Sequence, residues 1–199
     1  MKRLAGCVLF LLVLSTLAAH ADSTAITLNS YYTFTNGQWS LGFEFIPNSN
    51  ITVTTLGSFF PGGAIDQHGV AIWTENGTLL SQTTVTGNGS EGFLFSPISP
   101  LHLQAGVEYI ISATTLNDPY AVTEDVTVAP GITYVDHMEV QCATVDPCLP
   151  TNRYPGFVDF GANFQFTTGG AVPEPASLFL LGSGFVGLLG VARKRMKKA

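Results

Sequence analysis

Alternation between apolar and polar residues constrains the fold of this chain more than any other feature. Between residues 22 and 171, the segments 39–45, 107–113 and 160–166 each place an apolar side chain at every second position. Successive side chains of a β-strand point to opposite faces, so a period of two is typical of a strand with one buried face. The same region has no sustained period of 3.6 residues with helix caps.

Turn residues separate these segments. Asn76-Gly77 lies between the apolar runs 70–74 and 79–85, and this arrangement is a strong hairpin signal because both residues tolerate positive φ. We therefore predict an all-β domain, an antiparallel β-sandwich of jelly-roll type. The residues expected to be largely buried are Phe43, Phe45, Ile72, Trp73, Tyr109, Ile111, Phe164 and Phe166.

The first 21 residues have the layout of a secretory signal peptide. A basic pair at 2–3 precedes an apolar core at 4–17. Ala19 and Ala21 then supply the two small residues of a cleavage site before Asp22. We expect residues 1–21 to be removed on export, which leaves residues 22–171 as one exported domain.

Residues 172–199 combine three features in a fixed order. The motif Pro173-Glu174-Pro175 comes first, an apolar run at 176–192 follows, and a basic tail occupies 193–198. The run has the minimum length for a transmembrane helix, and the positive-inside rule keeps the tail cytoplasmic. An ordinary single-pass anchor is one interpretation, and a sorting signal is the other.

This order of motif, hydrophobic helix and basic tail resembles the bacterial PEP-CTERM sorting domain. The resemblance implies export through the secretion translocon of a Gram-negative bacterium and a transient stay in the inner membrane. An exosortase would then process the chain. The resemblance also implies a final location in the cell envelope or on the extracellular surface, in association with exopolysaccharide or biofilm.

The charge of the exported domain excludes one class of partner. Thirteen acids against a single cation, Arg153, give residues 22–171 a formal charge of −12. Nucleic-acid binding needs clustered Lys and Arg, so we expect no nucleic-acid partner. An acidic surface also keeps a lysine-poor exported protein soluble, and it leaves cations and neutral sugars as possible ligands.

Two cysteines, Cys142 and Cys148, remain once the signal peptide with Cys7 is removed. An oxidising compartment and the Asp146-Pro147 turn between them favour a disulfide, which should pin a short surface loop. Metal ligation by the same pair would require two further ligands.

The segment 51–114 carries a second resemblance, in the sequences IWTENGTLL at 72–80 and LQAGVEY at 103–109. These resemble a family of uncharacterised bacterial extracellular β-sandwich modules. The resemblance implies a fold and a surface location, and it implies no activity.

Sequence motifs for catalysis are missing. The chain has no Gly-x-Ser-x-Gly elbow, His-Glu-x-x-His pair or phosphate-binding glycine loop, and we assign no catalytic, cofactor or metal residue. The segments 66–68 and 136–139 each place an acid beside a histidine, so a secreted hydrolase stays a distant alternative. If a metal binds, calcium on loop acids such as Asp66, Asp118 and 124–125 is the better guess than zinc.

Sugar binding is the stronger alternative. Exposed aromatic rings stack on pyranose rings, and Tyr31, Tyr32, Tyr120, Tyr134 and Tyr154 are available, whereas alternation places Trp39 and Trp73 in the core. We therefore expect a structural or adhesive module that is not an enzyme, with a carbohydrate-binding module as the alternative. A solvent-exposed aromatic strip would favour carbohydrate binding.

Overall fold

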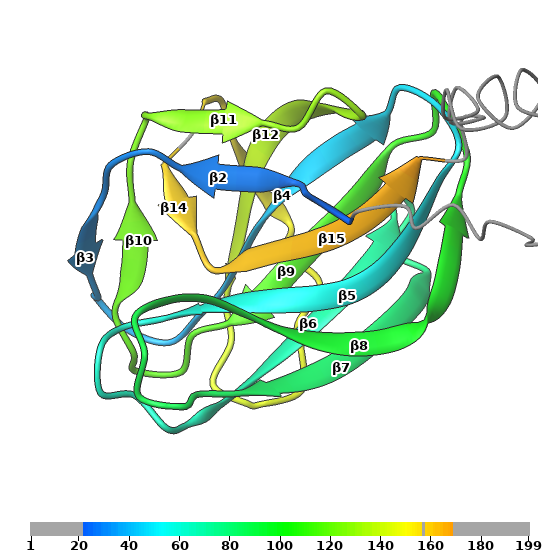
Figure 1. Ribbon diagram of the computed structural model, residues 1–199. Helices are drawn as coiled ribbons and strands as arrows, with labels where there is room; N and C mark the ends of the chain where they lie inside the picture. Colours follow the sequence, from blue (N-terminus) through cyan, green and yellow to red (C-terminus); the bar gives the residue numbers. More distant parts are fainter. Residues whose placement is uncertain (1–21, 157, 169–199) are drawn as a thin grey trace, which may run out of the picture. The chain divides into compact units, whose positions relative to one another are not determined.

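The computed structural model describes residues 22–156 and 158–168, and every regular element among them is a β-strand (Figure 1). All strand pairs are antiparallel. The all-β antiparallel class is confirmed. Two larger sheets pack face to face, an arrangement consistent with a β-sandwich.

The largest sheet has six strands in the order β13-β12-β4-β9-β6-β7. Its members are β13 (Asn152–Tyr154), β12 (Ile132–Gln141), β4 (Trp39–Pro47), β9 (Tyr109–Thr114), β6 (Gln67–Thr74) and β7 (Leu79–Thr86). The alternating segment 39–45 lies on β4, in the middle of this sheet, where both neighbours hydrogen-bond to it. A strand in this position needs a continuous apolar face, which its period of two supplies.

Three further sheets complete the domain. The four-stranded sheet has the order β1-β15-β5-β8, a three-stranded sheet has the order β14-β10-β3, and β11 pairs with β2. Their members are β1 (Ser23–Thr24), β15 (Ala162–Thr168), β5 (Ile51–Phe60), β8 (Gly92–Leu103), β14 (Asp159–Phe160), β10 (Tyr120–Val122), β3 (Tyr32–Phe34), β11 (Val126–Val128) and β2 (Ile26–Leu28).

Aromatic rings fill the space between the six-stranded and four-stranded sheets. The Phe164 ring of β15 lies 4.7 Å from that of Phe45 and 6.3 Å from that of Phe43, both on β4. Such contacts add to the free energy of burying the rings. All eight residues predicted to be buried are buried. Val107, in contrast, precedes β9 and is exposed, so the third alternating segment begins later than predicted.

The Asn76-Gly77 hairpin is confirmed, with a different turn. Gly77 has a φ of 82°, whereas Asn76 does not adopt positive φ. The Gly77 N–H donates to the Thr74 carbonyl at 2.8 Å, and the Thr74 N–H donates to the Thr78 carbonyl at 2.9 Å. The connection is therefore longer than a two-residue turn, and only glycine occupies the left-handed region.

A loop closed by the Cys142–Cys148 disulfide covers the outer face of the six-stranded sheet. The two Cα atoms lie 6.0 Å apart, within the usual range for a disulfide. The Cys148 carbonyl accepts a hydrogen bond from the Ser40 hydroxyl at 2.8 Å. A Cβ on Gly69 would lie 1.9 Å from the Val145 oxygen, so the loop backbone rests directly on β6.

A second, smaller core lies on the same outer face of the sheet, beside this loop. Ala71, Trp73, Ile110 and Met138 are buried on the outer face of the sheet, and Leu149 packs against them. Trp73 thus belongs to this second core and not to the space between the sheets. The predicted disulfide is present, and residues 143–146 between the two cysteines are exposed, as expected for a surface loop. The loop backbone also rests on β6, so the loop packs directly against the sheet.

The disulfide should therefore stabilise the domain measurably. We expect the double variant Cys142→Ser, Cys148→Ser to lower the free energy of unfolding by about 2–3 kcal/mol. The physical reason is the loss of loop closure together with weaker cover of the second core. Urea denaturation followed by tryptophan fluorescence would measure the change.

Thiol titration of the unreduced protein under denaturant provides the control. It should find no free thiol from Cys142 or Cys148, and reduction should reproduce the instability of the double variant. Two free thiols per exported chain would contradict the disulfide.

Candidate functional site

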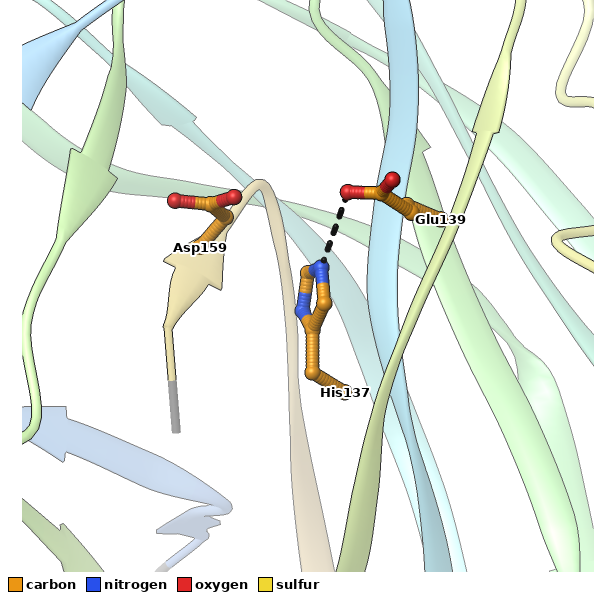
Figure 2. Close-up of side chains that lie close together, drawn as sticks. All are labelled: His137, Glu139 and Asp159. Atoms are coloured by element: carbon orange, nitrogen blue, oxygen red, sulfur yellow. Dashed lines mark hydrogen bonds and ion pairs between the residues drawn. The ribbon is translucent and has the colours of Figure 1, made fainter. Parts of the chain in front are cut away.

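Three side chains with metal-ligating and proton-transferring groups converge beside β12. His137 and Glu139 project from β12, and Asp159 approaches them from β14 (Figure 2). One ligand atom from each lies within 4.8 Å of the other two. His137 Nε2 lies 3.4 Å from Glu139 Oε2. In the part of the chain that the structure describes, this is the one such group of three or more His, Cys, Asp or Glu side chains.

The strand geometry explains why His137 and Glu139 are neighbours. They are two positions apart on one strand, so their side chains share a face. His137 pairs with Phe43 and Glu139 pairs with Leu41, which places both on the face toward the four-stranded sheet. An irregularity in the pairing between Tyr134 and His137 adjusts the register just before the cluster.

Asp159 reaches the cluster because the chain passes close to β4 at Gly161. A Cβ on Gly161 would lie 3.1 Å from Leu41 Cβ and 3.2 Å from the Leu41 oxygen. Glycine therefore permits the close approach of the segment between β14 and β15 to the six-stranded sheet. Since Leu41 pairs with Glu139, Asp159 arrives opposite that carboxylate.

Burial governs the electrostatics of the cluster. The His137 side chain is 2% exposed, while Glu139 and Asp159 are half-buried. Desolvation raises the pKa of Asp159; His137 acts in the opposite direction, and Glu139 raises the pKa further. Two carboxylates thus share a partly desolvated space with one imidazole.

The single arginine of the exported domain is occupied elsewhere. Arg153 on β13 forms an ion pair with the buried Glu44, and it lies 3.0 Å from Glu108 and 3.7 Å from Asp136. Burial raises the pKa of Glu44, and the Arg153 guanidinium partly offsets that increase. No lysine or other arginine lies within residues 22–168, so the described part of the chain offers the cluster no second permanent cation.

Aromatic residues surround the cluster. The Tyr154 ring lies 6.4 Å from the His137 ring. Across the three-stranded sheet, Asp159 pairs with Val122, which pairs with Tyr32, so their side chains point to one face. Phe34, paired with Tyr120, lies on the same face. Tyr32 is 64% exposed, Tyr154 48% and Phe34 46%.

Tyr120 connects the aromatic face to the acids. Its hydroxyl donates to Asn36 Oδ1 at 3.1 Å, and the same oxygen accepts from the Trp39 indole at 2.6 Å. Burial raises the pKa of Tyr120 to about 12, with Asp159 and Glu139 adding to the effect. The Tyr120 side chain is therefore uncharged and held in place beside the acidic cluster. Trp39 is half-buried at this end, so its assignment to the core was only partly correct.

A second constellation links a serine, a histidine and an acid. Ser58 Oγ lies 2.9 Å from His68 Nδ1, and His68 Nε2 lies 3.3 Å from Asp118 Oδ2. Leu116, with a φ of 49°, shapes the turn that brings Asp118 to the imidazole. Phe60 stacks on the His68 ring at 4.3 Å. Ser58 and His68 are fully buried, so this network ties β5 to β6 and exposes no nucleophile.

An apolar pocket of about 250 Å³ lies apart from these groups. Its lining includes Tyr31, Phe59, Phe93 and Phe95. The Tyr31 hydroxyl donates to Glu91 at 2.7 Å, and no charged side chain lines the pocket. The pocket therefore offers hydrophobic contacts to a ligand and no charged group.

Two of the loop acids that the sequence suggested as calcium ligands have other partners in the structure. Asp118 Oδ2 lies 3.3 Å from His68 Nε2, and Asp125 accepts hydrogen bonds from Asn29 and Ser30. Among the described residues, the loop acids suggested for calcium do not form a group of three ligands. The sorting motif Pro173, Glu174 and Pro175 and the cleavage residues Ala19 and Ala21 lie outside the described residues.

Sequence reasoning identified part of the cluster. His137 and Glu139 stood out as an acid–histidine segment, but Asp159 did not, because it is distant in sequence and belongs to another sheet. The sequence signal for the cluster is the spacing His-x-Glu, because residues two positions apart on a strand share one face.

Comparison with known protein families gives two matches. Residues 28–168 match the family described as Domain of unknown function (DUF4082), and the chain belongs to that family. Residues 171–195 match the PEP-CTERM protein-sorting motif. This motif marks an exported protein of the cell envelope that an exosortase processes. No curated protein matches the chain. None of the residues that the structure describes forms a helix suited to crossing a membrane.

The buried His68 should make stability depend on pH. Burial lowers its pKa below the ordinary 6.5, although Asp118 and Asp66 oppose the change. At pH values between the lowered pKa of folded His68 and 6.5, the unfolded chain binds more protons than the folded chain. The free energy of unfolding therefore falls as the pH drops through this window. We expect His68→Gln to flatten this dependence between pH values of about 7.5 and 5.5.

Urea denaturation across that range is the measurement. Burial raises the pKa of Asp118 above 3.8, so protonation of this carboxyl acts on stability in the opposite direction as the pH falls. Ser58→Ala is the matched control: it should cost about 1–3 kcal/mol at every pH while the pH dependence persists. Equal pH slopes in the parent and in His68→Gln would contradict the assignment.

Proposed function

We propose that the domain is an adhesive module of the cell surface that binds a neutral polysaccharide of the exopolysaccharide or biofilm matrix. The observation that carries the proposal is the exposed aromatic face that Tyr32 and Phe34 form on β3. An exposed aromatic strip distinguishes carbohydrate binding from a purely structural role. We propose no catalytic role for the domain.

The geometry of the face suits a sugar chain. Tyr32 and Phe34 are two positions apart on the edge strand β3, so their rings are spaced by about 7 Å along one face. Aromatic faces of this kind pack against the apolar faces of pyranose rings, and nearby polar groups accept hydroxyl hydrogen bonds. Asp159 lies on the same face of the three-stranded sheet, across β10 from Tyr32, and is an acceptor that this face offers.

The charge of the domain selects the kind of polysaccharide. Thirteen acids and one arginine repel a polyanion, and Arg153 is already engaged by three carboxylates. An uncharged glycan avoids this repulsion. The sorting motif supports the same setting, since it directs the chain to the envelope, where matrix polysaccharides accumulate.

Binding should depend on the aromatic face. We expect Tyr32→Ala and Phe34→Ala each to weaken binding to the host's neutral exopolysaccharide by about tenfold, which corresponds to about 1.4 kcal/mol. Affinity electrophoresis of the full chain in detergent, followed by a glycan array, would measure this.

Leu79→Ala is the matched control. Leu79 is an exposed apolar residue at the start of β7, the opposite edge strand of the six-stranded sheet from β13, and its removal should not change binding. Binding that survives the double variant Tyr32→Ala, Phe34→Ala would rule out this face.

Processing can be tested separately. In a host with an exosortase, mass spectrometry of the exported protein should find that residues 176–199 have been removed. Replacing Glu174 in Pro173-Glu174-Pro175 with Ala should preserve the tail by disabling the motif. An intact C-terminus on the exported parent protein would reduce residues 172–199 to an ordinary anchor.

A further inference from the structure

We propose that His137, Glu139 and Asp159 form a binding site for a divalent first-row transition-metal ion, for which Zn²⁺ is the representative. The site would take one ion through one imidazole nitrogen and two carboxylate oxygens. This inference does not rest on polysaccharide binding, and it would hold if the aromatic face bound nothing.

The spacing of two ligand atoms supports the proposal. Ligands at 2.0–2.2 Å from a tetrahedral zinc ion lie about 3.4 Å from one another. His137 Nε2 and Glu139 Oε2 are separated by 3.4 Å. An N–H···O hydrogen bond is usually 2.7–3.2 Å long, so the pair is spaced more like two ligands than like a good donor and acceptor.

The third ligand closes the set. A ligand atom of Asp159 lies within 4.8 Å of both partners, and Figure 2 shows the carboxylates of Asp159 and Glu139 to either side of the same end of the imidazole. Binding one ion through all three groups would require the half-buried Asp159 side chain to rotate until its oxygen reaches ligand distance. Three protein ligands then leave one position of a tetrahedron open.

The balance of charge supports a cation at this place. Glu139 and Asp159 bring two carboxylates into a partly buried space, and the one arginine of the described chain is bound to Glu44, Glu108 and Asp136. Buried carboxylates are costly unless a cation or hydrogen bonds compensate them. A divalent ion neutralises both.

The types of ligand select the class of metal. Imidazole nitrogen suits Zn²⁺ and other first-row transition metals, whereas Ca²⁺ takes six to eight oxygen ligands. His137 is 2% exposed and fixed on a central part of β12, so it cannot move aside for an all-oxygen shell. The site should therefore prefer Zn²⁺ to Ca²⁺, in contrast to the calcium expected from the loop acids.

Metal titration of the full chain tests the proposal. The protein is purified in detergent, dialysed against a chelator and titrated with ZnCl₂ by calorimetry. One Zn²⁺ should bind per chain, and the midpoint of thermal unfolding should rise with the concentration of free Zn²⁺. Asp159→Asn and Glu139→Gln should each weaken Zn²⁺ binding by about tenfold or more.

Matched controls separate this site from adventitious binding. Asp125→Asn removes an exposed acid and His102→Gln a histidine outside the cluster, and neither should change the affinity. His137→Gln should also weaken Zn²⁺ binding. If this variant fails to fold, Asp159→Asn still tests the proposal, because Asp159 is only half-buried. Three outcomes would each overturn the proposal. These are the absence of saturable Zn²⁺ binding, Zn²⁺ binding that neither Asp159→Asn nor Glu139→Gln changes, and Ca²⁺ binding as tight as Zn²⁺ binding.

Discussion

Contact between the phenylalanines of β4 and β15 holds the two large sheets together and also determines where the polar cluster forms. Phe164 packs on Phe43 and Phe45, so β15 is fixed over the centre of the six-stranded sheet. β12 hydrogen-bonds to β4 on one side, and β14 immediately precedes β15 in the chain. The aromatic packing therefore sets the separation between His137 on β12 and Asp159 on β14.

The distribution of charge follows a second constraint, the scarcity of cations. With one arginine among residues 22–168, most acids need water, hydrogen bonds or a histidine. Asp125 is exposed and bonded to Asn29 and Ser30, and Asp118 lies against His68. Arg153 is placed beside Glu44, the acid whose carboxylate is most deeply buried in that network. Glu139 and Asp159 are the remaining partly buried carboxylates. His137 lies beside them, Tyr120 and Tyr134 interact electrostatically with Asp159, and the one arginine is engaged by other acids, which is why we propose this cluster as the place for an external cation.

Sequence periodicity predicted the strands well and their assembly less well. Alternation at 39–45 predicted β4, and Asn76-Gly77 predicted a hairpin, because both signals are local. The alternating segment 160–166 is divided at Gly161 between β14 and β15, which belong to different sheets. Periodicity gives the faces of one strand without saying what covers them. It therefore could not show that Trp73 belongs to a second core under the disulfide loop. It could not place Asp159 beside Glu139 either, since that contact depends on Gly161 and on the packing of two sheets. The pairing of Cys142 with Cys148 was predictable because the loop between them is short and the compartment oxidising.

The three-stranded sheet carries both the aromatic edge strand and one side chain of the polar cluster. The disulfide loop covers part of the outer face of the six-stranded sheet, and Leu149, which directly follows the loop, packs against the buried cluster that contains Trp73. β3, in contrast, is an edge strand whose three residues are all exposed, and it presents Tyr32 and Phe34 to solvent. Edge strands in soluble proteins usually carry charge or are covered, because unpaired backbone groups and apolar side chains invite association. An uncovered aromatic edge beside a cluster of two carboxylates and a histidine departs from that rule. Large exposed apolar groups rimmed by polar residues commonly mark interaction sites. The same short strands β14 and β10 that carry Asp159 and Tyr120 also support β3, so any ligand on the aromatic edge would lie on the sheet that supplies Asp159 to the cluster.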